Sequence, residues 1–410
     1  SSLIFTVIIY LMGNRTRFRD VFYTYAQFQE VSWDSVSENV YMNMRAPYSR
    51  PYQVELQEGY TVKPVTGAYY YGNDNQVRFT GDEACKVDIS HLEDATRVTV
   101  RDVPAFEPRY FQMDKTVKNE DQIGFYGSLE IDHDKISGEI TSQFKEKMEN
   151  CTVFFNDKLI YLGDVEPGQT VEVGNYPVLE YPKNHSFDVA SYLSGQSAFD
   201  QADIEDDAYV EAVEKTNLLS FYLDYYMPSY LSAARVVGIK TNSGSHSGLI
   251  RAGDVEGRTV ASSNVDVYSS EDEILYRQAT QRQPKVISGN YDENSNALFG
   301  MDPVTLEYSL GSDIWIQRLT MDFVSDEFLQ NGSGTLLKFS GNIYFYNHST
   351  GSFDKQEPAK RDYDSVDLAP YLSPGNTITV KYVYENNSEY NWDVLLPVLN
   401  VMGRTIDDRD

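Results

Sequence analysis

Histidine and serine side chains are the first candidates for acid–base or nucleophilic chemistry in this chain. The histidines are scattered, at positions 91, 133, 185, 246 and 348, and none forms the HExxH pair of a zinc protease. Residues 244–248 read Gly-Ser-His-Ser-Gly, which is close to a nucleophile elbow, but an elbow has serine at its centre and His246 stands there. We therefore predict a flexible turn at this segment and no activated nucleophile.

Clustered acidic side chains are the candidates for metal binding. Residues 292–296 place oxygen-bearing side chains at positions 1, 3 and 5 of a calcium-type loop. The sixth position is Ala297 where such a loop has glycine, and the twelfth is Pro303 where it has a bidentate glutamate. A second acidic cluster also lacks the glycine, and it consists of Asp362, Asp364 and Asp367. We interpret both as solvated loops, and the sequence predicts no metal site and no cofactor.

Carboxylates leave one catalytic route open, which is glycoside cleavage by a pair drawn from distant strands. With 62 acidic residues in the chain, no such pair can be chosen from the sequence. No Walker A loop, dinucleotide fingerprint or zinc signature is present either. The sequence therefore favours a non-catalytic protein, with a carbohydrate-binding or carbohydrate-hydrolysing protein that uses acidic residues as the alternative.

Aromatic side chains in polar, loop-like segments are the candidate ligand-binding residues, because tyrosine and tryptophan often anchor partners. They are Tyr69, Tyr70, Tyr71, Tyr390 and Trp392. The competing interpretation is that these rings pack at junctions between modules. Trp315 lies in an alternating apolar run, so we predict it in the core.

Charge and cysteine content limit the possible partners and compartments. The net charge of −28 opposes nucleic-acid binding, which needs a basic face, and disfavours broad attraction to anionic membranes. Cys85 and Cys151 are too few for a four-ligand zinc site. They form either one disulfide or two buried thiols, and the sequence does not decide between these.

The elements that would position any site are mainly β-strands. Residues 136–141 alternate apolar and polar side chains, residues 156–158 separate two apolar runs as in a hairpin, and residues 166–169 fit a type II turn. Residues 373–380 repeat the pattern of residues 166–173, x-P-G-x-T-apolar-x-V. The repeat predicts two related β-sandwich modules, Ig-like or fibronectin-like, with a helix-containing region between them.

The predicted order is a flank at 1–20, a first sandwich at 21–180, a connecting region at 181–285 and a second sandwich at 286–410. The connecting region carries a predicted helix over 204–227, with Asp203 as its N-cap and Pro228 at its end.

Residues 3–12 are almost wholly apolar and are followed by arginines at positions 15, 17 and 19. Ten apolar residues are too few to span a bilayer, which takes about 20 as a helix, but they fit the last turns of a membrane helix. They also fit a buried β-strand rich in isoleucine and valine.

Three segments give the chain a resemblance to uncharacterised membrane-anchored proteins of Gram-positive bacteria. They are residues 3–18, the stretch from ISGEIT through LGDVEPGQTVEV at 136–173, and residues 395–398. The resemblance implies a membrane-tethered protein at the cell surface, on the extracytoplasmic face of the cell membrane. The resemblance implies location and architecture only. From the lack of catalytic motifs we expect a non-catalytic binding, scaffolding or sensory-accessory role, with protein partners or cell-wall glycan as candidate ligands.

Overall fold

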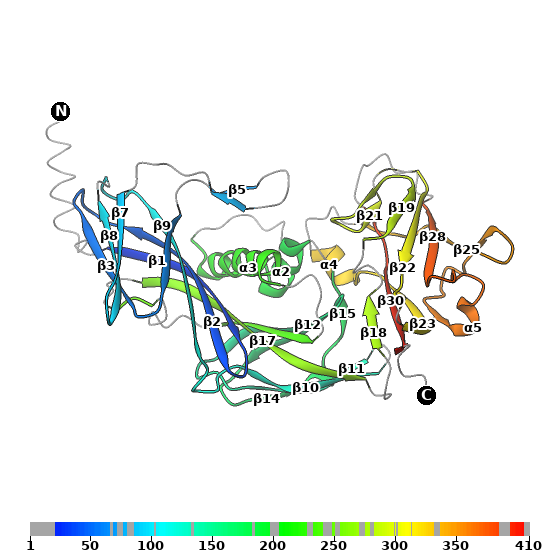
Figure 1. The fold of residues 1–410 in the computed structure, drawn as a ribbon, viewed down its shortest axis with the longest axis horizontal. Helices are drawn as coiled ribbons and strands as arrows, with labels where there is room; N and C mark the ends of the chain where they lie inside the picture. The colour runs from blue at the N-terminus through cyan, green and yellow to red at the C-terminus, as the bar shows by residue number, and fades with distance from the viewer. Residues whose placement is uncertain are drawn as a thin grey trace. The chain divides into compact units, whose positions relative to one another are not determined.

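The chain is mainly β, as predicted, in a computed structural model of residues 1–410 (Figure 1). The structure describes residues 21–405, apart from segments 66–68, 72–76, 80–85, 102–103, 133–134, 183–184, 197–204, 228–232, 241–247, 251–254, 270–274, 279–282, 299, 301, 313, 332–336 and 385–393. The apolar run at 3–12 lies outside the described residues. In the part that is described, no helix is long and apolar enough to cross a membrane.

The described chain divides into two compact units, and each is built from several separate segments. Unit 1 comprises Ser1–Gly124, Phe144–Met148 and Ile239–Ser263. Unit 2 comprises Phe125–Gln143, Glu149–Gly238 and Asn264–Asp410. The chain therefore passes from one unit to the other several times.

Unit 1 contains a sheet in the order β17–β1–β2–β9–β4, a smaller sheet β3–β8–β7 and a two-stranded ribbon β5–β6. In this unit β17 pairs in parallel with β1, and β2 pairs antiparallel with β1 and β9. The strands are β1 (Phe22–Val31), β2 (Ser35–Arg45), β3 (Tyr52–Gln57), β4 (Thr61–Val65), β5 (Tyr69–Tyr71), β6 (Val77–Phe79), β7 (Lys86–His91), β8 (Ala95–Arg101), β9 (Arg109–Lys118) and β17 (Val255–Ser269), of which the residues up to Ser263 belong to this unit.

The core of unit 1 draws alternate side chains from both of its larger sheets, which is the pattern of strands with one buried face. Val40 and Met42 come from β2, and Val98 and Val100 come from β8. All four are at most 1% exposed.

The first part of unit 2 holds two strand groups and two helices. Its strands are β10 (Phe125–Asp132), β11 (Lys135–Ser142), β12 (Met148–Phe155), β13 (Lys158–Val165), β14 (Thr170–Glu172), β15 (Leu179–Glu180) and β16 (Ala234–Lys240). They pair in the orders β10–β11–β14 and β15–β13–β12–β16. The helices are α2 (Ser186–Ser194) and α3 (Asp207–Tyr225), which pack side by side (Figure 1).

The stretch at 135–173 folds as its sequence predicts. Ile136 and Ile140 are buried on one face of β11, and β12 and β13 form the predicted hairpin. The turn at 166–169 is closed by the Gln169 amide, which donates to the Glu166 carbonyl at 3.0 Å, and Gly168 has φ +73°. In the second copy the positive φ falls on Asn376, at 54°, so the two turns are built differently.

Gly138 in β11 provides a stability prediction. Its φ is +119°, and an added Cβ would lie 2.3 Å from the carbonyl oxygen of Ser128 on the paired strand. Gly168→Ala is the matched control, because its Cβ would meet nothing within 4 Å. We expect Gly138→Ala to lower the free energy of unfolding by about 2–3 kcal/mol and Gly168→Ala by about 1 kcal/mol, measured by urea titration. Equal losses in the two variants would show that the close approach of β10 and β11 at Gly138 adds nothing to the loss of stability on substitution.

The predicted helix is confirmed as α3, but its start differs from the prediction. Asp203 lies outside the described residues, and the N-cap is Asp206, whose carboxylate accepts a hydrogen bond from the Ala208 amide at 3.0 Å. An N-cap side chain lies two or three residues before the backbone amide that it binds. Several aspartates in this segment meet that condition, so the sequence does not single out Asp206. The second helix, α2, was missed by the sequence interpretation.

The second part of unit 2 contains three sheets, in the orders β18–β30–β23–β27, β19–β22–β28–β25–β26 and β20–β21–β29–β24. The strands are β18 (Leu275–Gln278), β19 (Lys285–Ser288), β20 (Tyr291–Asp292), β21 (Ala297–Leu298), β22 (Val304–Ser309), β23 (Ile314–Asp322), β24 (Leu337–Lys338), β25 (Asn342–Asn347), β26 (Ser352–Lys355), β27 (Asp362–Asp364), β28 (Thr377–Val383), β29 (Val394–Leu395) and β30 (Val398–Thr405). Two short helices are α4 (Asp326–Asn331) and α5 (Ser365–Leu368).

One hydrophobic core joins the first two of these sheets. Leu319 of β23 and Val401 of β30 pack in the same buried cluster as Phe345 of β25 and Val380 of β28. The prediction that Trp315 belongs to the core is wrong, because its side chain is 68% exposed. Its neighbours in β23 point inward, and the alternation of a strand then directs Trp315 outward.

Candidate functional site

The five predicted ligand-binding residues are not shown to form a site. Tyr69, Tyr70 and Tyr71 make up β5, which pairs with β6 in a two-stranded ribbon. Tyr390 and Trp392 lie outside the described residues. Their role as a binding surface therefore stays a prediction.

The acidic clusters have structural partners in unit 2. Asp292 accepts hydrogen bonds from the Asn294 amide at 3.0 Å and the Ser295 hydroxyl at 2.7 Å, which closes a turn. Asp364 caps α5 by accepting from two backbone amides. Across the described segments, no group of three or more His, Cys, Asp and Glu side chains is placed to hold a metal ion. Cys151 is buried and Cys85 lies outside the described residues, so the choice between one disulfide and two buried thiols stays open.

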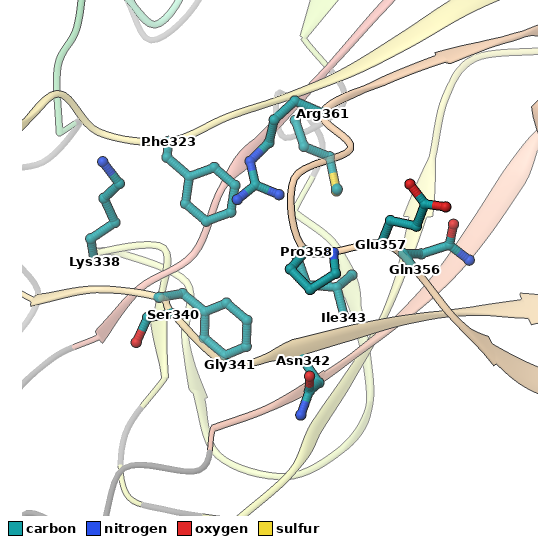
Figure 2. A pocket seen from close by; sticks show the side chains of 12 residues that line it. Phe323, Lys338, Ser340, Gly341, Asn342, Ile343, Gln356, Glu357, Pro358 and Arg361 are labelled. Carbon is teal, nitrogen blue, oxygen red and sulfur yellow. The ribbon is translucent and has the colours of Figure 1, made fainter.

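A pocket with a volume of about 370 Å³ opens on the second part of unit 2 (Figure 2). Its apolar lining comes from Met321 at the end of β23, Ile343 of β25 and two phenylalanines, Phe323 and Phe339. Met321 and Phe339 also belong to the hydrophobic core, so the floor of the pocket is held by tightly packed residues.

Two cationic side chains line the same pocket, beside Phe323 (Figure 2). The guanidinium carbon of Arg361 lies 4.2 Å from the centre of the Phe323 ring. Lys338 lies 2.9 Å from the Asp326 carboxylate, in a pair whose side chains are 37% and 68% exposed. Glu357 and Gln356 line the other side of the pocket (Figure 2).

Arg361 is an exposed cation that lines the pocket. Partial burial lowers its pKa, and the charge of Tyr363 acts in the opposite direction. Among the described residues, its guanidinium contacts the Phe323 ring and donates to the Lys360 carbonyl at 3.4 Å. A carboxylate is the natural partner for the remaining N–H groups, because guanidinium and carboxylate form paired hydrogen bonds.

A second cluster of polar residues lies in the interior of unit 2, around Lys158. Lys158 is the first residue of β13, and the antiparallel register places it opposite Glu180 of β15. Thr320 and Asp322 are two residues apart on β23 and therefore share a face. Asn400 of β30 pairs with Thr320, which brings its side chain to that face as well.

These side chains make a dense set of hydrogen bonds. The Lys158 ammonium nitrogen lies 3.0 Å from Asp322 Oδ2 and 3.5 Å from Glu180 Oε1. The Asn400 amide nitrogen donates to the same Asp322 oxygen at 2.6 Å and to Asp157 Oδ2 at 3.1 Å. The side chain of Lys158 is only 1% exposed, and that of Asp322 is 12% exposed.

Electrostatics keep the Lys158 amine charged despite its burial. Burial lowers the pKa of Lys158, but the attraction of Asp157, Asp322 and Glu180 outweighs this, so the pKa is raised above its ordinary value. Nearby Tyr181 has a raised pKa, first through burial and then through the negative charge of Asp157. The cluster therefore contains one buried cation and several carboxylates that compete for it.

Sequence reasoning missed both the pocket and the buried cluster. Residues 156–158, Asn-Asp-Lys, were interpreted as an ordinary hairpin turn, and such turns are normally solvated. In the structure all three side chains are at most 3% exposed. A lysine between two apolar runs is also common in surface hairpins, so the sequence carried no signal of its burial.

Comparisons with known proteins describe only part of the chain. The family named Domain of unknown function (DUF8725) matches residues 124–274, which include Lys158 and Glu180 but not Asp322 or Asn400. No curated protein matches the chain.

Among solved structures, two similar ones are of the yeast delta-COP-I mu-homology domain. The one complexed with a Dsl1 WxWxV peptide is 8% identical, covers 60% of this chain and 96% of its own, and has a TM-score of 0.27. The second is 10% identical, with 61% and 98% coverage and a TM-score of 0.26. Similarity at this level carries no argument about function.

Proposed function

We propose that this chain is a non-catalytic binding protein that holds a carboxylate-bearing peptide segment of a protein partner in the pocket beside Arg361. The observation that supports this most directly is the stacking of the Arg361 guanidinium on Phe323, at 4.2 Å, at the side of a 370 Å³ pocket with an apolar floor. Pockets of about 300–1,000 Å³ with an apolar lining and a few polar groups are typical of ligand sites.

The net charge of the whole chain bears on which class of ligand the pocket can bind. With a net charge of −28, the chain repels acidic partners over most of its surface. At this pocket Lys338 is paired with Asp326, and Glu357 lines the other side. Arg361 is therefore the cation that the site offers to an acidic ligand. An acidic segment would add charge-assisted hydrogen bonds to the exposed Arg361 guanidinium, whereas a neutral one would not.

The carbohydrate alternative has weaker support at this pocket. Sugars bind to proteins largely by stacking on exposed aromatic faces, and Arg361 already covers the face of Phe323. At the Lys158 cluster the carboxylates of Asp157 and Asp322 are engaged with Asn400 in a buried setting, which a polysaccharide could not enter.

We also propose that the protein is tethered to the cell membrane on its extracytoplasmic face and that its modules are Ig-like sandwiches. The apolar run at 3–12 and the arginines after it support the tether. The single core shared by two sheets in the second part of unit 2 supports the sandwich assignment. Protease accessibility of the native protein in intact cells tests the location, since an extracytoplasmic chain is cleaved and a cytoplasmic one is protected.

A random peptide library displayed on phage and selected on the full chain tests the binding proposal. We expect peptides rich in aspartate and glutamate to be enriched. Arg361→Gln should weaken a selected peptide at least about tenfold, because a charge-assisted hydrogen bond contributes about 1.5–3 kcal/mol. Isothermal titration with the synthetic peptide measures the change.

Lys381→Gln is the matched control, because Lys381 also lies over a phenylalanine ring, at 5.7 Å from Phe353, but does not line the pocket. It should leave the peptide affinity unchanged. Enrichment of neutral peptides, or equal binding by the Arg361→Gln variant, would reject the proposal. Binding to cell-wall polysaccharide on a glycan array, independent of Arg361, would favour the carbohydrate alternative.

A further inference from the structure

We propose that Lys158 and Asp322 condense within unit 2 to form an amide cross-link between their side chains. The reacting groups are already in contact, with the Lys158 nitrogen 3.0 Å from Asp322 Oδ2. Both side chains are held by strand registers rather than by flexible loops, Lys158 at the start of β13 and Asp322 at the end of β23. Because folding already holds the two groups together, the reaction does not incur the entropy loss of bringing two reactants together.

The reaction balances with no external reagent. An ammonium and a carboxylate contain all the atoms of one amide and one water. The Nζ–Cγ bond forms, the bond from Cγ to one Asp322 oxygen breaks, and two protons of the ammonium leave with that oxygen as water. No oxidant, reductant or co-substrate is needed.

Glu180 is placed to move the proton that this step requires. The amine can attack only after it loses a proton, and Glu180 Oε1 lies 3.5 Å from the Lys158 nitrogen. The other Glu180 oxygen, Oε2, accepts a hydrogen bond from the Ser325 hydroxyl at 2.8 Å, which fixes the carboxylate. A carboxylate beside the amine serves as the general base, and the proton that it takes up can then pass to the leaving oxygen.

Asn400 is placed to stabilise the charge that develops on Asp322. Its amide nitrogen donates to Asp322 Oδ2 at 2.6 Å, and this oxygen carries the negative charge when the amine adds to the carbon. Asn400 is 1% exposed, so bulk water does not compete with the donor. The same burial slows hydrolysis of the amide once it has formed.

The high pKa of Lys158 makes the neutral amine rare, so the cross-link should form slowly after folding. We therefore expect the linked fraction of purified full-length protein to rise with time. Intact mass under denaturing conditions should fall by the mass of one water. After trypsin digestion, peptide 148–183, uncleaved at Lys158, should appear joined to peptide 319–338.

Two variants and an internal control make the test specific. Lys158→Arg keeps the positive charge but should retain the full mass, and Glu180→Gln should slow the loss of water. The exposed pair of Lys145 and Asp121, at 2.7 Å, provides the control in the same digest and should stay unlinked. Its side chains are 67% and 68% exposed, so water and mobility oppose condensation there.

An unchanged mass in aged wild-type protein, with the two peptides separate, would overturn the proposal. Loss of ammonia instead of water, with Lys158 joined to Asn400, would overturn the assignment of Asp322 as acceptor. A fully linked Glu180→Gln variant would remove Glu180 from the mechanism.

Discussion

Replacing Lys158 by methionine is expected to lower the free energy of unfolding of unit 2 by about 3–5 kcal/mol, because it leaves buried carboxylates without their cation. Asp322 is 12% exposed and Glu180 28% exposed, so water can solvate neither of them fully. Methionine fills a similar volume, and the loss therefore reports on charge rather than on a cavity. The comparison uses freshly purified wild-type protein, before the proposed cross-link has formed, so that the loss reports on the ion pair.

Urea unfolding with hydrogen exchange read at β13 and β23 measures this loss, because a chain of two units need not unfold in one step. Lys145→Met is the control, since its exposed pair with Asp121 should contribute less than about 1 kcal/mol. A Lys158→Met protein that stays within about 1 kcal/mol of wild type would show that the carboxylates are neutralised without the lysine.

Truncating Phe345 to alanine is expected to cost about 3–5 kcal/mol in the second part of unit 2. The side chain is 0% exposed and lies 5.0 Å from the Tyr363 ring and 5.4 Å from the Tyr371 ring, measured between ring centres. Its removal leaves a cavity that the sheets on either side cannot close without shifting their strands. The same urea titration, with hydrogen exchange at β25 and β28, provides the measurement.

Phe353→Ala is the matched control on the neighbouring strand β26. Its ring is 38% exposed, so we expect a loss of roughly 1 kcal/mol or less. A comparable loss of stability in both variants would mean that the side chains around Phe345 shift to fill the cavity left by its ring. The contrast between the two phenylalanines therefore tests how closely the second core is packed.

The mainly β class could be predicted because strand alternation is a local property. Ile136 and Ile140, and likewise Ile378 and Val380, show their burial directly in the order of residues. The pairing of β1 with β17 could not be predicted, because the paired residues lie more than two hundred positions apart. No local feature of the sequence specifies which distant strand pairs with the free edge of β1. The organisation of each unit from several segments follows from such pairings.

The candidate sites were harder to predict than the fold. Arg361 and Phe323 are distant in the sequence, and only the packing of the second core brings them into one pocket. Lys158 appeared as a turn residue because a turn is recognised from its own residues, whereas its burial depends on β23 and β30. Trp315 was predicted to be buried and is exposed, the reverse of Lys158. Its apolar run was interpreted as core, although alternate residues of the strand face outward.

The parallel pairing of β1 with β17 has a consequence for synthesis on the ribosome. One edge of β1 can be covered at once by β2, which follows it directly, but the other edge waits for Val255 and the residues after it. At about 5–20 residues per second, the wait is about 10–50 s. During this interval the nascent chain presents an open strand edge that can pair with other chains. We expect its early β-strands to be a principal binding site for chaperones that act during translation.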